Sequence, residues 1–251
     1  MTTSVDIALR ADDVHKRFGG IHALRGVSVD VARGSVLGVI GPNGSGKTTL
    51  TNVLSGAYRL DGGRVYVGGT DATRKAAHTR SVLGMARTFQ NPHVFTSLTV
   101  RQNMVVAVAH RSDRRHARQL TEDVDEWLST VGLAKFADRV ASELSGGQRK
   151  LVEFARAMAH RPSVVLMDEP FAGVHPHVKE TLHRLISEQA ALGTTAFLIV
   201  SHEVPDLVSL SDRFLCMTGG QVLTEGTPDE VCADPRVIEA YLGTPIPESA
   251  A

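Results

Sequence analysis

Residues 36–50, VLGVIGPNGSGKTTL, place a short apolar run before a glycine-rich loop and the first turn of a helical pattern. Gly41, Gly46, Lys47 and Thr48 fit the spacing G-x-x-x-x-G-K-[ST] of a phosphate-binding loop. Glycines let backbone N–H groups turn inward around phosphates, and the following helix points the positive end of its dipole at them. The pattern predicts a lysine that reaches the β- and γ-phosphates and a threonine hydroxyl that ligates Mg²⁺. The loop residues expected to contact a nucleotide are Gly41, Pro42, Asn43, Gly44, Ser45, Gly46, Lys47, Thr48 and Thr49.

Two carboxylates end the apolar run VVLMDE. The run predicts a buried strand, and Asp168 and Glu169 stand at its carboxyl end, where open α/β sheets bind their ligands. An aspartate in this place can hold Mg²⁺. A glutamate beside it can accept a proton from water or orient that water. We therefore expect Asp168 to be a metal ligand and Glu169 to be the general base.

Three further side chains allow two interpretations each when they are considered alone. Phe18 is either a core residue or a ring that stacks on a purine. Gln90 ends a predicted strand and is either a surface amide or a ligand of Mg²⁺ and the attacking water. His202 follows the apolar run TTAFLIV and is either structural or a contact to a γ-phosphate.

Residues 143–160, ELSGGQRKLVEFARAMAH, predict an amphipathic helix that is capped by Ser145. Gly146 and Gly147 fall in its first turn, where glycine is costly to a helix. One explanation is an anionic group that approaches the helix N-terminus closely. The other is a well-capped helix that tolerates two glycines.

Strands and helices alternate along the rest of the chain. Apolar runs and turn residues predict strands or hairpins, which lie at 5–30, 58–69, 84–90, 164–168, 194–200 and 213–226. Helical periodicity or capping signals mark residues 98–160, 176–193 and 227–242. The last of these begins with a capping box and is expected to be one helix followed by a tail.

The composition is that of an ordinary globular protein. The 251 residues, of which 42% are hydrophobic, suit one large domain or a domain with a subdomain. A formal net charge of +0 gives no reason to expect a nucleic-acid partner. Cys216 and Cys232 have neither metal-type spacing nor the look of a disulfide framework. We see no signal peptide and no apolar run near the ~18 residues of a membrane span, so we expect a cytosolic protein that can dock on a membrane protein.

Together and in this order, the motifs resemble those of the nucleotide-binding subunit of an ATP-binding cassette (ABC) transporter. GPNGSGKTT resembles the Walker A motif, VVLMDE the Walker B motif, and LSGGQ at Leu144 to Gln148 the family signature. The resemblance implies that Phe18 is the aromatic A-loop residue, Gln90 the Q-loop glutamine and His202 the switch histidine. The implied catalytic residues are Glu169, His202 and Gln90, and the implied Mg²⁺ ligands are Thr48, Gln90 and Asp168.

The resemblance also implies a fold and an assembly. The fold is the α/β, P-loop NTPase, ABC-ATPase fold, with a mainly parallel sheet core, an antiparallel β subdomain and an inserted helical subdomain. One domain would span 1–251, with the helical signature subdomain at about 91–160 and a C-terminal helix and tail at 227–251. In the family, ATP and Mg²⁺ bind between two subunits arranged head to tail, as a homodimer or a heterodimer. The signature residues that would contact the partner's ATP are Ser145, Gly146, Gly147 and Gln148.

Three segments resemble one importer class more closely: GMARTFQNPHVFTSLTVRQNM, EPFAGVHP and GTPDEVCADPRVIEAYLG. They are similar to ATP-binding subunits of bacterial importers of branched-chain amino acids, and of their urea and amide relatives. This resemblance implies a peripheral ATPase on the cytoplasmic face of the inner membrane. Its partners would be transmembrane permease subunits and, indirectly, a secreted substrate-binding protein.

Other functions share the same core. Urea or amide import is one alternative, and lipid transport or export is another, although the C-terminal segment favours import. A soluble ABC ATPase that acts on nucleic acid or ribosomes is a third, but those relatives usually carry two cassettes or long coiled-coil insertions, which this chain lacks.

Two positions depart from the importer class. His175 stands at the D-loop position, which is usually Asp and often Asn, and the charge of a histidine there varies near neutral pH. Glu203 follows the switch histidine where the class usually has Asp, and we expect little consequence from that change.

Overall fold

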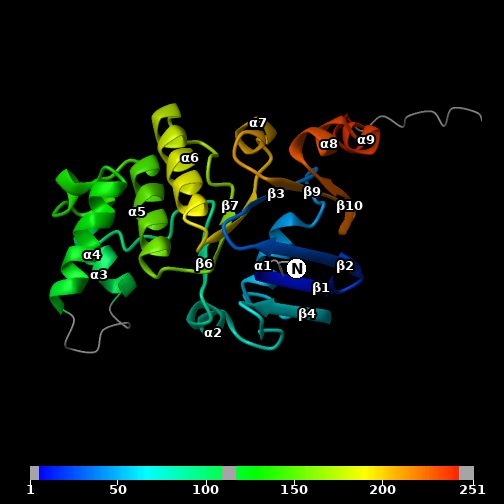
Figure 1. Cartoon of the computed structure of the whole chain (residues 1–251), viewed down its shortest axis with the longest axis horizontal. Helices are drawn as coiled ribbons and strands as arrows, with labels where there is room; N and C mark the ends of the chain where they lie inside the picture. The colour runs from blue at the N-terminus through cyan, green and yellow to red at the C-terminus, as the bar shows by residue number, and fades with distance from the viewer. Residues whose placement is uncertain (1–5, 109–116, 243–251) are drawn as a thin grey trace, which may run out of the picture.

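The computed structural model describes residues 6–108 and 117–242. Two sheets and a lobe of helices make up the described chain (Figure 1). The tail expected after Leu242 lies outside the described residues. Within the described ranges, no helix has both the length and the apolar character that crossing a bilayer requires.

The larger sheet has six strands in the order β10-β9-β3-β8-β7-β6. Neighbouring strands are parallel except for the antiparallel pair β9 and β10. The strands are β3 (Val36–Ile40), β6 (Met85–Thr88), β7 (Val164–Asp168), β8 (Ala196–Val200), β9 (Arg213–Thr218) and β10 (Gln221–Gly226). All residues of β3, β7 and β8 are buried, because both faces of this sheet are covered. The predicted parallel core is therefore confirmed.

The smaller sheet is antiparallel, in the order β2-β1-β4-β5. Its strands are β1 (Ile7–Phe18), β2 (Ile21–Ala32), β4 (Gly62–Val67) and β5 (Thr70–Asp71). Along residues 27–31 the valines are buried while Ser28 is exposed, which is the alternation of a strand with one face toward solvent. These valines, Leu50 of helix α1 (Lys47–Leu54) and Leu198 of β8 share one apolar cluster, which joins the two sheets around α1.

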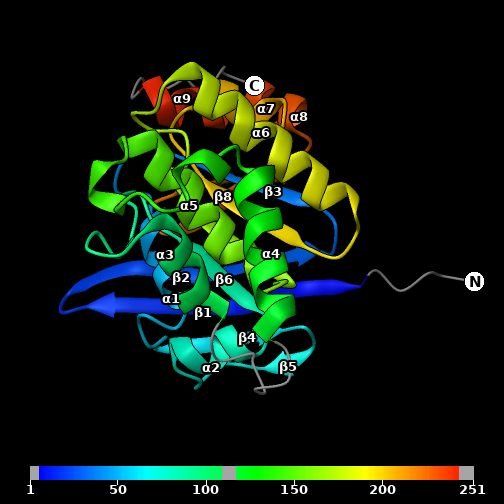
Figure 2. The same ribbon diagram turned by 90° about the vertical axis from the view of Figure 1, so that its left-hand side faces the viewer.

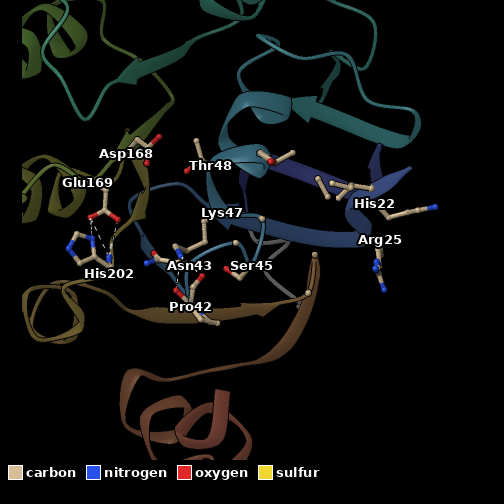
Figure 3. A pocket seen from close by; sticks show the side chains of 18 of the residues that line it. His22, Arg25, Pro42, Asn43, Ser45, Lys47, Thr48, Asp168, Glu169 and His202 are labelled. Atoms are coloured by element: carbon tan, nitrogen blue, oxygen red, sulfur yellow. Dashed lines mark hydrogen bonds and ion pairs between the residues drawn. The ribbon is translucent and has the colours of Figure 1, made fainter. Parts of the chain in front are cut away.

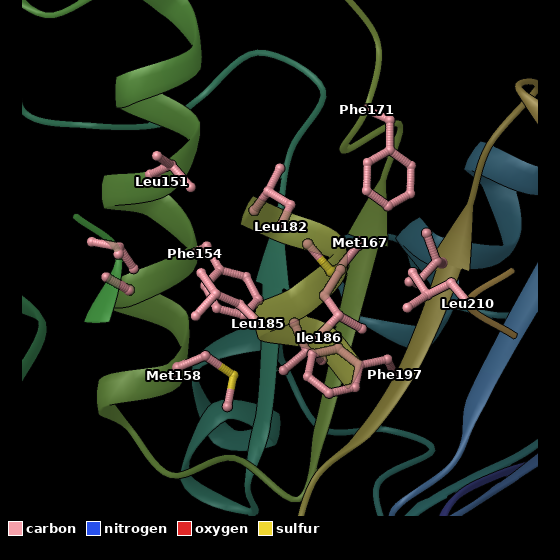
Figure 4. Packing of buried hydrophobic residues seen from close by; sticks show 14 of the residues in the cluster. Leu151, Phe154, Met158, Met167, Phe171, Leu182, Leu185, Ile186, Phe197 and Leu210 are labelled. Atoms are coloured by element: carbon pink, nitrogen blue, oxygen red, sulfur yellow. The ribbon is translucent and has the colours of Figure 1, made fainter. Parts of the chain in front are cut away.

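The helical lobe is inserted between β6 and β7 and lies away from the antiparallel sheet (Figure 1). Figure 2 views the molecule from the side of this lobe. It contains α3 (Val100–Val108), α4 (Ala117–Thr130) and α5 (Gly146–Ala159). The long helix α6 (Pro176–Ala191) follows β7 and packs on the same side of the large sheet. Phe154 of α5, Leu185 of α6 and Phe197 of β8 converge in the second apolar cluster (Figure 4). Burial of each such side chain contributes about 1.5–3 kcal/mol, so this cluster fixes α5 on the sheet.

The C-terminal segment differs from the expectation of one helix. It forms two helices, α8 (Pro228–Ala233) and α9 (Pro235–Leu242). Asp234 between them is extended, with ψ of 119°, because the ring of a following proline disfavours the helical conformation. The predicted capping box at Thr227 and Glu230 is present. Two short helices were not predicted: α2 (Ala77–Val82) and α7 (Val204–Val208).

Both cysteines are free thiols, as the spacing indicated. Cys216 is buried in β9, and burial raises the pKa of its thiol to about 11.

Candidate nucleotide site

A cavity of about 900 Å³ opens at the carboxyl ends of β3 and β7, beside the glycine-rich loop (Figure 3). It brings together residues that the sequence places far apart. The predicted residues on its wall are Gly41, Pro42, Asn43, Gly44, Ser45, Gly46, Lys47, Thr48, Thr49, Gln90, Asp168, Glu169 and His202. Such a constellation at strand ends is where an α/β sheet binds its ligand.

The loop conformation depends on glycine at two positions. Gly41 has φ of 146°, and a Cβ there would lie 2.2 Å from the carbonyl oxygen of Met217. Gly46 has φ of 105°, and its Cβ would lie 2.8 Å from the carbonyl oxygen of Ala23. Any other side chain would push the loop out of this path. Close backbone packing therefore requires glycine at both of these positions of the motif.

Two loop side chains offer hydrogen-bond donors that can bind an anion. The Oγ atom of Ser45 is buried and has no hydrogen-bond partner within the described chain, which is a costly state for a hydroxyl in a dry interior. The ammonium of Lys47 donates to the carbonyl oxygens of Gly41 at 2.6 Å and Pro42 at 3.0 Å. Burial lowers the pKa of this ammonium, and the nearby Glu169 carboxylate opposes that shift. The donors on the loop suit a phosphate.

Asp168 ends β7 as a buried carboxyl. Burial raises its pKa, and the guanidinium of Arg87 opposes the shift from 3.6 Å away. Arg87 is held in turn by the side chains of Asn52 at 2.7 Å and Ser55 at 2.9 Å, both from α1 and its C-cap. The sequence did not single out Arg87, because its partners are 32 residues or more away along the chain.

Glu169 and His202 are in direct contact (Figure 3). Nδ1 of His202 lies 2.9 Å from Oε2 of Glu169, and the backbone N–H of His202 donates to Oε1 at 3.1 Å. The hydroxyl of Ser201 donates to the same carboxylate at 3.1 Å. Glu169 has φ of 49°, a left-handed conformation that few residues other than glycine adopt and that is found disproportionately at functional sites. The carboxylate is therefore held at a fixed place beside the strand end.

The donor set suits Mg²⁺. The side chains of Thr48, Gln90 and Asp168 all border the cavity, and each offers an oxygen. Mg²⁺ prefers oxygen ligands and is usually bound through one or two carboxylates together with substrate phosphates. These three residues would hold the ion, which would neutralise charge on the phosphates.

Two groups of predicted site residues lie elsewhere. Phe18 does not border the cavity; the residue is 44% exposed, and its ring packs edge-on against Tyr58, with centroids 5.4 Å apart. It pairs across the turn with Ile21, which does border the cavity. The signature residues from Ser145 to Gln148 are also outside the cavity. Ser145 caps α5, and its hydroxyl accepts from the N–H of Gln148 at 3.2 Å.

Several cavity residues were not predicted from the sequence. His22 and Arg25 come from β2, and Gly219 and Gly220 come from the turn between β9 and β10. Tyr241 comes from α9, 200 residues after Gly41. Gly219 and Gly220 belong to a predicted hairpin, and Tyr241 belongs to the importer-like C-terminal segment, but no local pattern assigned any of these residues to a ligand site.

The two departures from the importer class have visible roles. His175 is the N-cap of α6, and its Nδ1 accepts from the N–H of His177 at 3.4 Å. Aspartate and asparagine are preferred N-caps for the same reason, since their side chains accept from that backbone. Glu203 forms an ion pair with Lys179, which also contacts Asp206 at 2.7 Å, and so links α6 to α7.

The matching family models and relatives are all ATP-binding proteins of transporters. The family model described as ABC transporter matches residues 24–172, and that of the branched-chain amino acid ATP-binding cassette transporter matches residues 221–246. A probable branched-chain amino acid transport ATP-binding protein of Archaeoglobus fulgidus is 37% identical, over 94% of this chain and 95% of the relative. High-affinity branched-chain amino acid transport ATP-binding proteins of Pseudomonas aeruginosa and Escherichia coli are 35% and 32% identical, over 94% of this chain and 97% of each relative.

Solved structures give the same result for the fold. A nucleotide-free ATP-binding cassette from an ABC transporter has a TM-score of 0.84 and 36% identity, over 95% of this chain and 100% of that structure. The ADP conformation of an ATP-binding cassette has the same TM-score and identity, over 95% and 99%. The similarity in sequence and in fold therefore extends over nearly the whole chain.

Proposed function

The chain belongs to the ABC transporter family of ATP-binding proteins, and from this premise we propose that it is the ATP-hydrolysing subunit of a bacterial importer for branched-chain amino acids. The observation that carries the proposal is the contact between Glu169 and His202 at the edge of a cavity that also contains the glycine-rich loop. The substrate class comes from the matching C-terminal segment and from the named relatives.

ATP binds with its phosphates on the glycine-rich loop. Lys47 and the buried hydroxyl of Ser45 contact phosphate oxygens, and Thr48, Gln90 and Asp168 would hold Mg²⁺. Glu169 accepts a proton from the attacking water, while His202 contacts the γ-phosphate. Phe18 lies outside the cavity but is exposed and pairs with Ile21 on the cavity wall, and in the proposal it stacks on an adenine ring that extends beyond the cavity.

The site is half of a larger one. The exposed N-terminus of α5, with Ser145 as its cap, is an anion site without a phosphate-binding loop of its own. In a head-to-tail dimer it faces the ATP held by a second subunit. ATP closes this dimer only through contacts that differ between the open and closed states, and the γ-phosphate supplies them. Closure and reopening move the permease.

A mixing experiment tests the dimer directly. Lys47→Ala damages the loop and leaves the signature intact, whereas Ser145→Arg does the opposite. Each variant alone is expected to be nearly inactive as an ATPase. Mixed dimers contain one site with both halves intact, so mixing the variants restores part of the activity if the chain forms homodimers. Normal ATPase activity of Ser145→Arg alone, in the complete transporter, would contradict the shared site.

A reconstitution experiment tests the substrate. The complete transporter in proteoliposomes is supplied with its binding protein loaded with leucine, isoleucine or valine, and ATPase activity is measured. We expect stimulation by these ligands and none by urea or short amides. Stimulation by urea alone would reassign the importer, and activity without any permease dependence would remove the transport function.

A further inference from the structure

The C-terminal helix α9 reaches the phosphate-binding loop through one side chain. The backbone N–H of Gly41 donates to the hydroxyl oxygen of Tyr241 at 2.7 Å. The parallel pairing of β3 with β9 ends one residue earlier, at Ile40 opposite Cys216, so this N–H finds its acceptor in α9 rather than in the sheet. A buried N–H that loses its acceptor is costly, which gives this single contact weight.

The carbonyl group of Gly41 is hydrogen-bonded as well as its N–H. The carbonyl oxygen of Gly41 accepts from the ammonium of Lys47 at 2.6 Å. Further along the loop, the carbonyl oxygen of Ser45 accepts from the N–H of Gly220 at 3.0 Å. The loop is thus anchored by its own lysine, by the turn after β9 and by the C-terminal helix. Tyr241 is the one of these anchors that comes from residues 227–242. No other residue of that range borders the cavity.

The chemistry of the hydroxyl suits a place beside phosphates. Tyr241 borders the cavity together with Lys47, Asp168 and Glu169. Burial raises the pKa of its phenol to about 12, so the group stays neutral at physiological pH. Its oxygen accepts from Gly41, and its proton remains available as a donor. A neutral donor adds no negative charge next to the phosphates.

We infer that Tyr241 is a positioning residue of the nucleotide site, through which the C-terminal segment holds the phosphate-binding loop in the form that binds ATP. This inference deepens the proposed function and rests on it for the identity of the nucleotide. If Tyr241 has this role, the segment that follows the last strand contributes to nucleotide binding.

The test is Tyr241→Phe in the full-length protein, which removes the hydroxyl and keeps the ring. We expect the Kd for MgATP, measured by calorimetry, to rise about five- to tenfold, in line with the loss of one hydrogen bond to a buried donor. In the ATPase assay, KM for ATP rises by a similar factor and kcat stays within about twofold, because Glu169 and His202 are untouched. Without nucleotide, hydrogen exchange at the Gly41 amide becomes faster.

A control separates positioning from general packing. Ile238 lies on the same helix and is 45% exposed. Ile238→Ala should leave Kd, KM and Gly41 exchange at their wild-type values. If Tyr241→Phe lowers the melting temperature but binds MgATP with the wild-type Kd, the contact is structural only and the inference fails. If the wild-type protein does not bind MgATP at all, the proposed function fails instead.

Discussion

Lys150 of α5 lies 3.0 Å from the backbone carbonyl oxygen of Glu169, the residue assigned as general base. The same ammonium donates to the carbonyl oxygens of Pro170 at 3.1 Å and Ala172 at 2.9 Å. It is buried, and it lies five residues after Ser145 on the signature helix. One side chain therefore ties the helix that would face a partner's ATP to the loop that carries this chain's own base.

We predict that Lys150→Met lowers the free energy of unfolding by about 2–4 kcal/mol, because three carbonyl groups lose a charged donor. Urea denaturation measures this change. The kcat for ATP should fall as well, since the backbone of Glu169 loses its support. Lys150→Arg should restore part of both losses, whereas Lys135→Met, at an exposed position, should change neither. If Lys150→Met unfolds at the same urea concentration as the wild type, the three hydrogen bonds make no net contribution to the free energy of unfolding.

Glu169→Gln keeps the size of the side chain and removes its ability to accept a proton. An amide oxygen at the Oε2 position can still accept from Ser201 and from the backbone of His202. We expect the Kd for MgATP to stay within about threefold, while kcat falls by roughly 10²- to 10⁴-fold. Single-turnover hydrolysis and calorimetry on the purified complex separate these two quantities, with exposed Glu180→Gln as the matched control. Wild-type turnover in Glu169→Gln would end its assignment as the base.

Lys47→Ala is predicted to weaken ATP binding by about ten- to a hundredfold, the equivalent of one charge-assisted contact. The substitution also frees the carbonyl oxygens of Gly41 and Pro42, which now accept from the lysine. Calorimetry with ATP and with ADP checks the effect, and exposed Lys75→Ala should bind both normally. An unchanged Kd for ATP in Lys47→Ala would refute the contact.

The sequence predicted local features well because each depends on neighbouring residues. The phosphate-binding loop, the cap at Ser145 and the buried strand before Asp168 all follow from short patterns, and the structure has each of them. The ABC-ATPase fold is also confirmed, since several motifs in a fixed order leave little freedom. Helix α7, by contrast, has only five residues, too few for a periodic pattern to be visible.

Long-range partners could not be predicted in the same way. Arg87 meets Asp168, and Tyr241 meets Gly41, only because the fold brings distant segments together. The break before Pro235 could have been predicted, because a proline disfavours helix in the residue before it. The capping box at Thr227 favoured a single long helix and obscured that signal.

Glu153 of α5 makes the stability of the protein depend on pH. Its carboxylate accepts from the backbone N–H groups of Phe89 at 3.3 Å and His93 at 2.8 Å, on either side of Gln90. Burial raises its pKa above the ordinary value of 4.5, and the two backbone donors oppose that shift. In the window between 4.5 and the folded pKa, the folded state holds more protons than the unfolded state, so stability falls as the pH rises through it.

We predict that Glu153→Gln removes this part of the pH dependence. Free energies of unfolding are measured by urea titration at several values from pH 4.5 upward, and that of the wild type should fall relative to that of the variant as the pH rises. Glu180→Gln, on the exposed face of α6, should follow the wild-type curve. Parallel curves for the wild type and Glu153→Gln would contradict the assignment of the titration to Glu153.

His175 provides the last prediction, at the N-terminus of α6. The bond from the N–H of His177 to Nδ1 of His175 is long, at 3.4 Å, so the histidine is a weak cap. Asparagine is among the best N-caps, and alanine among the poorest. We therefore expect His175→Asn to raise the free energy of unfolding by about 0.5 kcal/mol and His175→Ala to lower it by about as much. For a chain of this size the two variants should melt about 2–4 °C apart, because each kcal/mol shifts the melting temperature by that amount.

Calorimetric melting of the two variants beside the wild type measures the order of their melting temperatures. If His175→Ala melts with His175→Asn, the side chain does not cap the helix, and its place in the loop before α6 needs another explanation.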